Sequence, residues 1–397
     1  LMLGFSAKSS ANMTQDIIDG KLDKRRKGVY GPPMGLKSII FVDDLNMPEV
    51  ETYGAQPPIE LVRQLIDNGG WYDLKEKTWR TIIDTSVMSA MGPPGGGRNF
   101  VTPRLLRHFN LFCFCEFDDE TLKRIFNTIT SWHFNGQSFG GDVRSLSEGI
   151  VEATLDIYRS AMQNLLPTPA KSHYTFNLRD FSRVIQGVLL CRPTEGFNKN
   201  VLIRLWVHEA LRIFGDRLID DKDKEWMQEY MGNITQTKFG TAFYDLFKHL
   251  DQTGEKKLTP NDLRNCMFGD YMTENEPKPY VEITDLTELQ TKMEEYLAEF
   301  NAQSRKPMDL VMFSFAIEHV SRINRVLRMP GGNALLVGVG GSGRQSVTKL
   351  ATFICGYNLK QIEISKNYTN VEWREDLKEV LRGAGTGADP LTFLFSD

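Results

Sequence analysis

The sequence lacks several features that would place it in a specialised class of protein. No run of about 18 apolar residues occurs, so nothing predicts a membrane span, and no signal peptide is recognisable. The 47 basic and 51 acidic side chains nearly cancel, which argues against a general nucleic-acid-binding surface. We therefore expect a protein that binds neither nucleic acid nor membrane.

Cysteine is also scarce, with five residues in a chain of 397. Their number is odd and their spacing fits no zinc site, so we expect reduced, buried thiols of an intracellular protein. The chain begins with Leu1 rather than methionine and stops at Asp397 just after an apolar run. Both ends are therefore expected to be internal to a longer protein, and the length suffices for two or three domains. The cysteines are Cys113, Cys115, Cys191, Cys266 and Cys355.

The first informative stretch is an apolar run that ends in two acids. Residues 39–42 are rich in β-branched side chains and lead directly into Asp43 and Asp44, which is typical of a buried strand in a parallel sheet. Ligands of open α/β sheets bind at the carboxyl ends of the strands, and a buried acid needs a compensating charge. The pattern matches the Walker B motif, whose first Asp helps to hold Mg²⁺. The alternative is a strand that ends in an acidic turn.

A second apolar run, residues 333–337, leads into a glycine-rich loop. Gly338 and Gly343 have the spacing of a phosphate-binding loop (Walker A), in which backbone N–H groups and the following helix face the phosphate. Arg344 stands where Lys is usual, and Gln345 stands where a Ser or Thr would bind Mg²⁺. The alternative is a glycine turn without a ligand. The candidate nucleotide-binding residues are Gly338, Gly340, Gly341, Ser342, Gly343, Arg344, Gln345 and Ser346.

Arginines stand at the start of two expected helices. Thr102 and a following proline predict a helix that begins with Arg104 and Arg107 on one face. Arg179 lies in the first turn of a helix that begins after Asn177. A cation in the first turn opposes the helix dipole, so we expect an anion nearby, and an arginine finger that reaches a neighbouring nucleotide would explain the first pair. The alternative is a solvated basic face.

The remaining pattern predicts a mixed α/β chain. Residues 82–88 are expected to form a buried strand in the same parallel sheet as residues 39–42, and residues 335–337 a strand in a separate sheet. A further strand is expected at residues 111–117. Residues 145–272 read as helical, and His208 within them is expected to be a core or partner-facing side chain.

Five stretches carry a resemblance to a known family. They are FVDDLNMPEVETYGAQPPIELVRQLID (41–67), SAMGPPGGGRN (89–99), TPRLLRH (102–108), FNLRDFSRVIQG (176–187) and GNALLVGVGGSGRQS (332–346). As a set they resemble dynein heavy chains, and most closely the axonemal branch. That family carries six AAA+ modules in one ring-forming polypeptide, so the resemblance implies an α/β fold: P-loop AAA+ parallel-sheet modules with an α-helical lid subdomain between them.

The resemblance also implies a division of the chain. Residues 1–130 correspond to the large subdomain of the third AAA+ module, lacking its Walker A loop. Residues 131–300 correspond to the helical lid with a linker, and residues 301–397 to the start of the fourth module, from Walker A to Walker B. The stalk, the linker domain and the first module of a dynein lie outside this chain.

Site roles follow from the same resemblance. Asp43 would be the Mg²⁺-linked Walker B acid, and Asp44 stands where many AAA+ proteins carry the Glu that polarises water. Arg104 or Arg107 would be the finger, and Arg179 the sensor in the lid. In the fourth module the residues of the glycine loop would hold phosphate, with Asp397 as the Mg²⁺-linked acid.

The resemblance implies ATP or ADP with Mg²⁺ as cofactors, in the motor ring of a ciliary dynein. Its partners would be neighbouring AAA+ modules of the same heavy chain, microtubules through parts outside this chain, and dynein intermediate and light chains. The expected location is the cytoplasm and cytoskeleton, in the axoneme of a cilium or flagellum.

Departures from the family pattern at Asp44, Gly92, Arg344 and Gln345 weaken hydrolysis more than nucleotide binding. We therefore expect regulatory nucleotide sites, and this chain alone is expected to be inactive as an ATPase. Two alternatives stay open: a non-hydrolysing AAA+ regulatory or structural module, and a different AAA+ remodelling ATPase.

Overall fold

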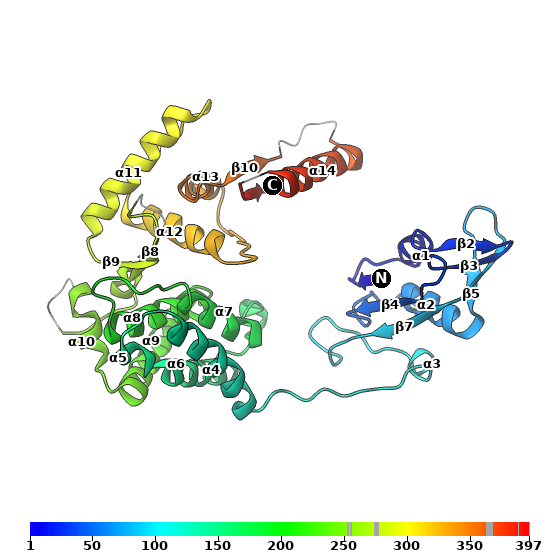
Figure 1. Ribbon diagram of the computed structural model, residues 1–397, viewed down its shortest axis with the longest axis horizontal. Helices are drawn as coiled ribbons and strands as arrows, with labels where there is room; N and C mark the ends of the chain where they lie inside the picture. Colours follow the sequence, from blue (N-terminus) through cyan, green and yellow to red (C-terminus); the bar gives the residue numbers. More distant parts are fainter. Residues whose placement is uncertain (252–253, 255, 274–277, 363–367, 388, 397) are drawn as a thin grey trace. The chain divides into compact units, whose positions relative to one another are not determined.

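The chain folds into two compact units, Leu1–Glu116 and Phe117–Asp397, each of which is described by itself (Figure 1). The computed structural model describes residues 1–251, 254, 256–273, 278–362, 368–387 and 389–396. Among these residues, no helix has both the length and the apolar character needed to cross a bilayer.

The first unit is built around a three-stranded parallel sheet in the order β1-β4-β7. The central strand β4 (Ser38–Asp43) pairs in parallel with β1 (Met2–Gly4) on one side and β7 (Thr85–Ser89) on the other. Ile40 and Val42 of β4 are buried in a core to which helices α1 (Ala11–Asp19) and α2 (Pro57–Asn68) contribute. The strand expected at residues 39–42 is therefore confirmed.

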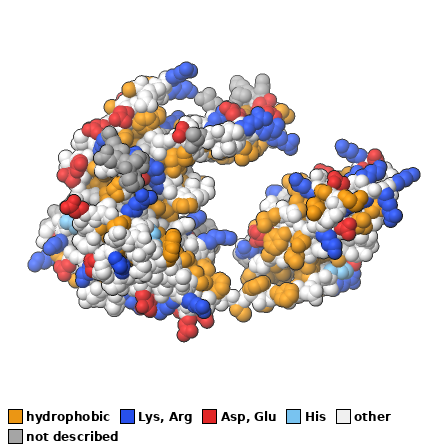
Figure 2. Space-filling model, in the orientation of Figure 1, with side chains coloured by type: hydrophobic (Ala, Val, Ile, Leu, Met, Phe, Trp, Pro, Cys, Tyr) orange, Lys and Arg blue, Asp and Glu red, His pale blue; other side chains and the backbone are white. Residues whose placement is uncertain are grey.

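The opposite face of this sheet is open to solvent. Ile39 of β4 and Met88 of β7 are each about half exposed, although both faces of a parallel sheet are normally covered. None of the described residues buries these two side chains. Apolar side chains, drawn orange, are visible on the surface of this unit in Figure 2.

Residues 82–88 do not form the single strand that we expected. Ile82 ends β6 (Trp79–Ile82), whereas β7 begins at Thr85, and Asp84 between them has a φ of 56°. That left-handed residue breaks the ladder, so β6 leaves the parallel sheet and joins a four-stranded sheet in the order β2-β3-β6-β5. The other strands of that sheet are β2 (Asp23–Arg26), β3 (Val29–Gly31) and β5 (Gly70–Tyr72).

The end of the first unit differs most from expectation. Helix α3 (Pro103–Leu106) begins with proline as expected, but Thr102 makes no side-chain capping bond. Residues 111–117 form no strand, and their apolar side chains are exposed. A strand needs a backbone partner, and none of the described strands pairs with this stretch. Cys113 and Cys115 in this stretch are exposed, so the expectation of buried thiols was wrong for these two cysteines.

The second unit begins with a bundle of helices around a large apolar core, drawn in green in Figure 1. A five-residue π-helical turn, Leu211–Gly215, extends α8. Three short 3₁₀ turns (Pro169–Lys171, Lys248–Leu250 and Asp262–Asn265) lie in the connections. The helices are α4 (Asp119–Gly136), α5 (Gly141–Arg144), α6 (Ser147–Asn164), α7 (Leu178–Val188), α8 (Lys199–Ala210), α9 (Asp221–Phe239) and α10 (Phe243–Phe247).

A second core follows, formed around α12 and α13. An antiparallel pair, β8 (Met267–Gly269) with β9 (Val281–Ile283), precedes it. Strands β10 (Asn358–Gln361) and β11 (Leu391–Leu394) form a parallel pair. The helices are α11 (Leu286–Gln303), α12 (Ser314–Arg328), α13 (Arg344–Ile354) and α14 (Asn370–Thr386).

The strand expected at residues 335–337 is absent. Leu335 and Val337 are about nine-tenths exposed, and this stretch pairs with neither β10 nor β11. A run of apolar residues specifies a strand only where a neighbouring strand accepts its hydrogen bonds, and none of the described residues supplies one.

A buried ion pair joins the bundle to the second core. Arg325 of α12 donates from Nε to both carboxylate oxygens of Glu209 of α8, at 3.0 and 2.9 Å, and also from Nη2. Tyr280 donates its hydroxyl to the same carboxylate at 3.1 Å, and His208 Nδ1 lies 3.2 Å from it. Glu209 is fully buried, and His208 is a core side chain as expected.

Charge keeps this buried acid ionised. Burial alone would favour the neutral acid, but the Arg325 charge and the hydrogen bonds from His208 and Arg325 lower the pKa of Glu209 to about 2. Burial lowers the pKa of His208 to about 4, so this imidazole is neutral at pH 7. Among the described groups that contact the Glu209 carboxylate, only Arg325 carries a positive charge at pH 7, since His208 and Tyr280 are neutral. The ionised carboxylate therefore depends on Arg325.

Gly187 of α7 leaves room for the Glu209 carboxylate. A Cβ at this position would lie 1.7 Å from Glu209 Oε2. We predict that Gly187→Ala destabilises the fold by about 1–3 kcal/mol. In the matched change Gly232→Ala on α9, the new Cβ would meet nothing closer than 3.7 Å, so that variant is expected to be neutral or up to about 1 kcal/mol more stable. Urea unfolding of both variants tests this, and equal effects would contradict the packing described for Glu209.

Candidate functional site

The acid pair lies at the carboxyl end of the central strand. Asp43 is the last residue of β4, and its Oδ1 accepts a hydrogen bond from the backbone N–H of Asp44 at 3.0 Å. Asp44 has a φ of 52°, a left-handed conformation in which Asp is more common than most residues. The chain thus turns sharply after Asp43, whose side chain stays exposed at the sheet edge where ligands of open α/β sheets bind.

Arg98 contacts the second acid, a contact that we did not expect from the sequence. Its Nη2 lies 3.6 Å from Asp44 Oδ1, with both side chains about two-fifths exposed. A Cβ at Gly92 would lie 2.9 Å from Arg98 Nε, so the glycine lets the arginine fold back across the loop. Gly92 has no side chain that could contact the acids, but the loop that begins at Gly92 brings the Arg98 side chain close to Asp44. The sequence signal for a sharply turning loop was the run of glycines at 95–97, and all three have a positive φ in the structure.

Asn46 anchors this loop. Asn46 is fully buried, and its side-chain Nδ2 donates to the backbone carbonyl of Gly92 at 2.8 Å. Its backbone carbonyl accepts a hydrogen bond from the N–H of Asn99 at 2.9 Å. Its Oδ1 is buried and has no hydrogen-bond partner among the described residues. A buried amide oxygen therefore remains as an acceptor two residues after Asp44.

The two arginines predicted as a finger, Arg104 and Arg107, make no described contact with the acid pair. Arg107 lies after α3, where its Nη2 is 3.4 Å from Asp67 Oδ1 and its Nε donates to His108. Although desolvation opposes the shift, hydrogen bonding from Arg63 and the charges of His108 and Arg107 hold the pKa of Asp67 below its ordinary value. Arg104 is exposed on α3. No described contact joins either arginine to Asp43 or Asp44. A finger that acts on the nucleotide of another module must be free of its own module's acids in this way.

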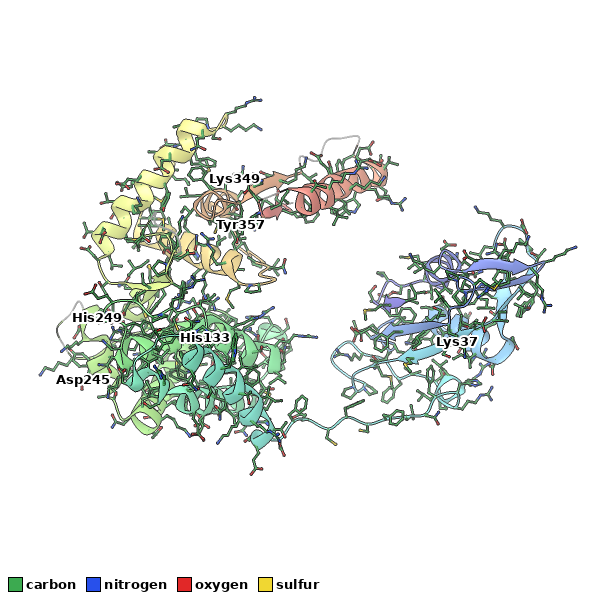
Figure 3. All side chains as sticks on the ribbon, viewed as in Figure 1. Lys37, His133, Asp245, His249, Lys349 and Tyr357 are labelled. Atoms are coloured by element: carbon green, nitrogen blue, oxygen red, sulfur yellow. The ribbon has the colours of Figure 1, made fainter. Side chains whose placement is uncertain are left out.

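The glycine loop of the second unit ends at the start of α13. Gly341 and Gly343 have φ values of 78° and 77°, and Gly343 is the N-cap of the helix that begins with Arg344. A positive φ is costly for any other residue. In Figure 3, Lys349 lies on this helix and Tyr357 follows its end.

Side chains of the loop meet the neighbouring strand. Gln345 in the first turn of α13 accepts a hydrogen bond at Oε1 from Gln361 Nε2 at 3.2 Å, and Gln361 is the last residue of β10. A Cβ at Gly338 would lie 3.0 Å from Ser342 Oγ. The N-terminus of a helix and the carboxyl end of a strand thus converge, as in a phosphate site. Asp397, the expected acid of this module, lies outside the described residues.

The remaining predicted residue, Arg179, is exposed in the first turn of α7, where its N–H donates to the Asn177 cap at 2.8 Å. It belongs to the second unit, whereas Asp43 and Asp44 belong to the first. The structure therefore groups the acids with Arg98 and Asn46, and the glycine loop with Gln361.

No group of three or more His, Cys, Asp or Glu side chains among the described residues could hold a metal ion. Mg²⁺ does not need such a group, since it is usually held by one or two carboxylates, phosphate oxygens and water. Asp43 at the strand end therefore has the chemistry that fits a Mg²⁺ ion bound together with a nucleotide.

Comparison with known families assigns three consecutive segments. Residues 1–117 match the P-loop containing dynein motor region, residues 125–224 the ATPase lid domain of dynein heavy chains, and residues 308–397 the P-loop containing dynein motor region D4. These matches and the parallel sheets place the chain in the class of P-loop AAA+ proteins: it is part of a dynein motor region and includes a helical lid.

The relatives specify the branch. The chain is 54% identical to mouse dynein axonemal heavy chain 3 over its whole length, 51% identical to mouse dynein axonemal heavy chain 12 over 96% of it, and 47% identical to mouse dynein axonemal heavy chain 1 over its whole length. It covers 10%, 12% and 9% of these proteins, so it spans about a tenth of the length of the relatives it matches. The chain belongs to the dynein heavy chain family, in its axonemal branch.

Two contacts hold the loop near the acid pair: the hydrogen bond from Asn46 to Gly92 and the ion pair of Arg98 with Asp44. We predict that the more buried contact, that of Asn46, contributes more to the free energy of unfolding. Asn46→Ala should cost about 1–3 kcal/mol, because it leaves the carbonyl of Gly92 without its buried donor. Arg98→Ala should cost less than about 1 kcal/mol, because the exposed pair with Asp44 is screened by water. Urea unfolding of the two variants checks this order. A larger loss for Arg98→Ala would mean that the ion pair, not the buried amide, holds the loop.

Proposed function

We propose that this chain is part of the nucleotide-binding ring of an axonemal dynein heavy chain, with ATP or ADP bound at the glycine loop. The observation that carries the proposal is the loop geometry at Gly341 and Gly343, within the segment that matches motor region D4. Left-handed glycines directly before a helix direct backbone N–H groups toward an anion.

Side chains at this loop support binding more than turnover. Arg344 in the first turn of α13 supplies a permanent positive charge for a phosphate. Gln345, in the place of the hydroxyl that would bind Mg²⁺, has its oxygen hydrogen-bonded to Gln361. An amide in this position stabilises the loop against the strand and provides no hydroxyl ligand for the metal. Gly338, Gly340, Ser342 and Ser346 complete the proposed phosphate cradle.

At the first site, Asp43 would hold Mg²⁺ together with phosphate oxygens, and Asp44 would act on the attacking water. The contact between Asp44 and Arg98 opposes that second role, because it places Asp44 Oδ1 3.6 Å from a guanidinium nitrogen, which competes with a water for this oxygen. This observation favours the second candidate function for the first site, a regulatory module that binds nucleotide without hydrolysing it.

Three arginines would complete the machinery of the whole ring. Arg104 and Arg107 would reach the nucleotide of a preceding module, and Arg179 would sense phosphate from the lid. The division into a third module (1–130), a lid with linker (131–300) and the start of a fourth module (301–397) belongs to the same proposal. With Asp397 as the acid of the fourth module, the metal sites would be Asp43 and Asp397.

The wider role follows from the family. Nucleotide state in these modules would be coupled to movement on microtubules in the axoneme of a cilium or flagellum. The coupling partners would be neighbouring AAA+ modules of the same heavy chain, and dynein intermediate and light chains would assemble with the parent protein.

Binding without turnover is the measurable form of this proposal. We expect the purified 397-residue chain to bind a fluorescent ATP analogue, and Arg344→Ala to weaken the affinity about tenfold, because it removes a charge-assisted contact. Arg374→Ala, an exposed arginine of α14, is the control and should bind as the unsubstituted chain does.

Phosphate release should stay far below the roughly 1–100 s⁻¹ typical of kinases, because the acids and the glycine loop belong to different units. Turnover in that range, abolished by Arg344→Ala, would contradict the regulatory assignment. Equal binding by both arginine variants would contradict the nucleotide site itself.

A further inference from the structure

A pocket separate from both nucleotide sites lies where the bundle meets α12. It has a volume of about 250 Å³ and is lined by side chains from the π turn, α9, the 260–264 segment and α12. Its volume lies below the roughly 300–1,000 Å³ of pockets for drug-sized ligands, so its ligand would be small. The charged lining residues are Arg212, Asp216, Lys224, Arg264 and Arg322.

Positive charge exceeds negative charge in this pocket. Arg212 Nε lies 3.1 Å from Asp216 Oδ2, and Arg322 Nη2 lies 3.3 Å from Asp216 Oδ1, so one carboxylate serves two guanidinium groups. Glu318, which is buried, is likewise shared between Arg322 and Arg264. Lys224, the fourth cation of the lining, pairs with Asp221 at 3.0 Å. The three arginines therefore share two carboxylates, which leaves one positive charge without a counter-charge inside the cluster.

The arginine nitrogens also retain donor capacity. Arg322 Nε is buried and has no hydrogen-bond partner within the described part of the chain, and Arg212 Nε, although 3.1 Å from Asp216 Oδ2, forms no hydrogen bond of good geometry there. Burial and the neighbouring Arg212 charge lower the pKa of Arg322, as expected where cations are crowded together.

The rest of the pocket is apolar. Leu211, Leu218, Met227 and Leu263 line it, and Phe315 lies beside Arg264, whose guanidinium carbon is 5.0 Å from the ring centroid. Such a surface gains free energy by burying an apolar body next to the charged group. A compact phosphate would leave this surface uncovered, whereas an organic acid would cover it.

We propose that this pocket binds a small organic monocarboxylate, with its carboxylate held by Arg212 and Arg322 and its apolar body packed against the leucine, methionine and phenylalanine side chains. A single negative charge matches the one unbalanced guanidinium, and the planar fork of arginine suits a carboxylate. The site goes beyond the nucleotide function, because none of its residues belongs to the acid pair or the glycine loop.

Calorimetric titration of the full 397-residue chain tests the proposal. The probes are 4-phenylbutyrate, its neutral amide 4-phenylbutyramide, and inorganic phosphate. We expect 4-phenylbutyrate to bind at least about tenfold more tightly than the other two, and its affinity to fall as salt is raised. Equal binding of the amide, or binding of phosphate alone, would overturn the proposal.

Helix α12 provides a matched pair of variants. Arg322 and Arg328 have the same side-chain exposure of 26%, and both form ion pairs. Arg322 pairs with Asp216 and Glu318, whereas Arg328 pairs with Asp270 outside the pocket. Arg322→Gln should weaken 4-phenylbutyrate binding at least about tenfold, and Arg328→Gln should leave it unchanged. If Arg322→Gln fails to fold by circular dichroism, Arg264→Gln at the more exposed rim replaces it, with the same expectation of weaker binding. A folded pocket variant that binds as the unsubstituted chain does would overturn the proposal.

Discussion

The buried contact between Glu209 and Arg325 is the constraint on which the second unit depends. An isolated carboxylate in an apolar core costs many kcal/mol, so α8 can bury Glu209 only where a cation reaches it. Arg325 does so from α12, a helix that is 116 residues away along the chain. Two further ion pairs lie in the same region: Arg204 of α8 donates to Glu282 of β9 at 2.7 Å, and Arg264 contacts Glu318 of α12 at 3.0 Å.

These ion pairs have a consequence for signalling between modules. The bundle contains the segment that matches the dynein lid, and α12 lies in the segment that matches motor region D4. A buried pair tolerates little displacement, because any separation leaves charges unpaired in a medium of low polarity. A lid that changes position would therefore carry α12, and with it the core that supports α13 and its glycine loop. These contacts form a physical connection from the segment that matches the lid to the glycine loop of the segment that matches motor region D4.

Local features of this fold could be predicted from the sequence, and features that depend on distant partners could not. The strand before Asp43 and the helix from Pro57 to Asn68 are encoded by short apolar patterns and by proline and glycine at the helix ends. Residues 111–117 and 335–337 have equally strong apolar patterns but lack a neighbouring strand among the described residues. The break between β6 and β7 at Asp84 was not predicted, because Asp84 has a positive φ although it is not a glycine.

The same distinction applies to the candidate site. Asp43 and Asp44 were predicted from the apolar run that precedes them, and the glycines of the second unit from their spacing, whereas Arg98 contacts Asp44 only because its loop folds back across Gly92. Glu209 carries no sequence signal for its partner, since charge pairs far apart in the chain are specified by packing. The structure thus adds contacts between distant residues, such as that of Arg98 with Asp44, which the sequence pattern alone does not specify.

The coupling of the lid to the next module is tested most directly by a double-mutant cycle on Glu209 and Arg325, measured by urea unfolding of the whole chain. Arg325→Met alone should cost about 3–5 kcal/mol, because it leaves a carboxylate buried without its cation, and the double variant Glu209→Gln with Arg325→Met should recover a large part of that loss. A cost for Arg325→Met below about 1 kcal/mol, or strictly additive effects in the double variant, would show that the two groups are not coupled. The helical lid would then not be tied to the next module by this contact, and the proposed dependence of the second unit on the buried pair would be wrong.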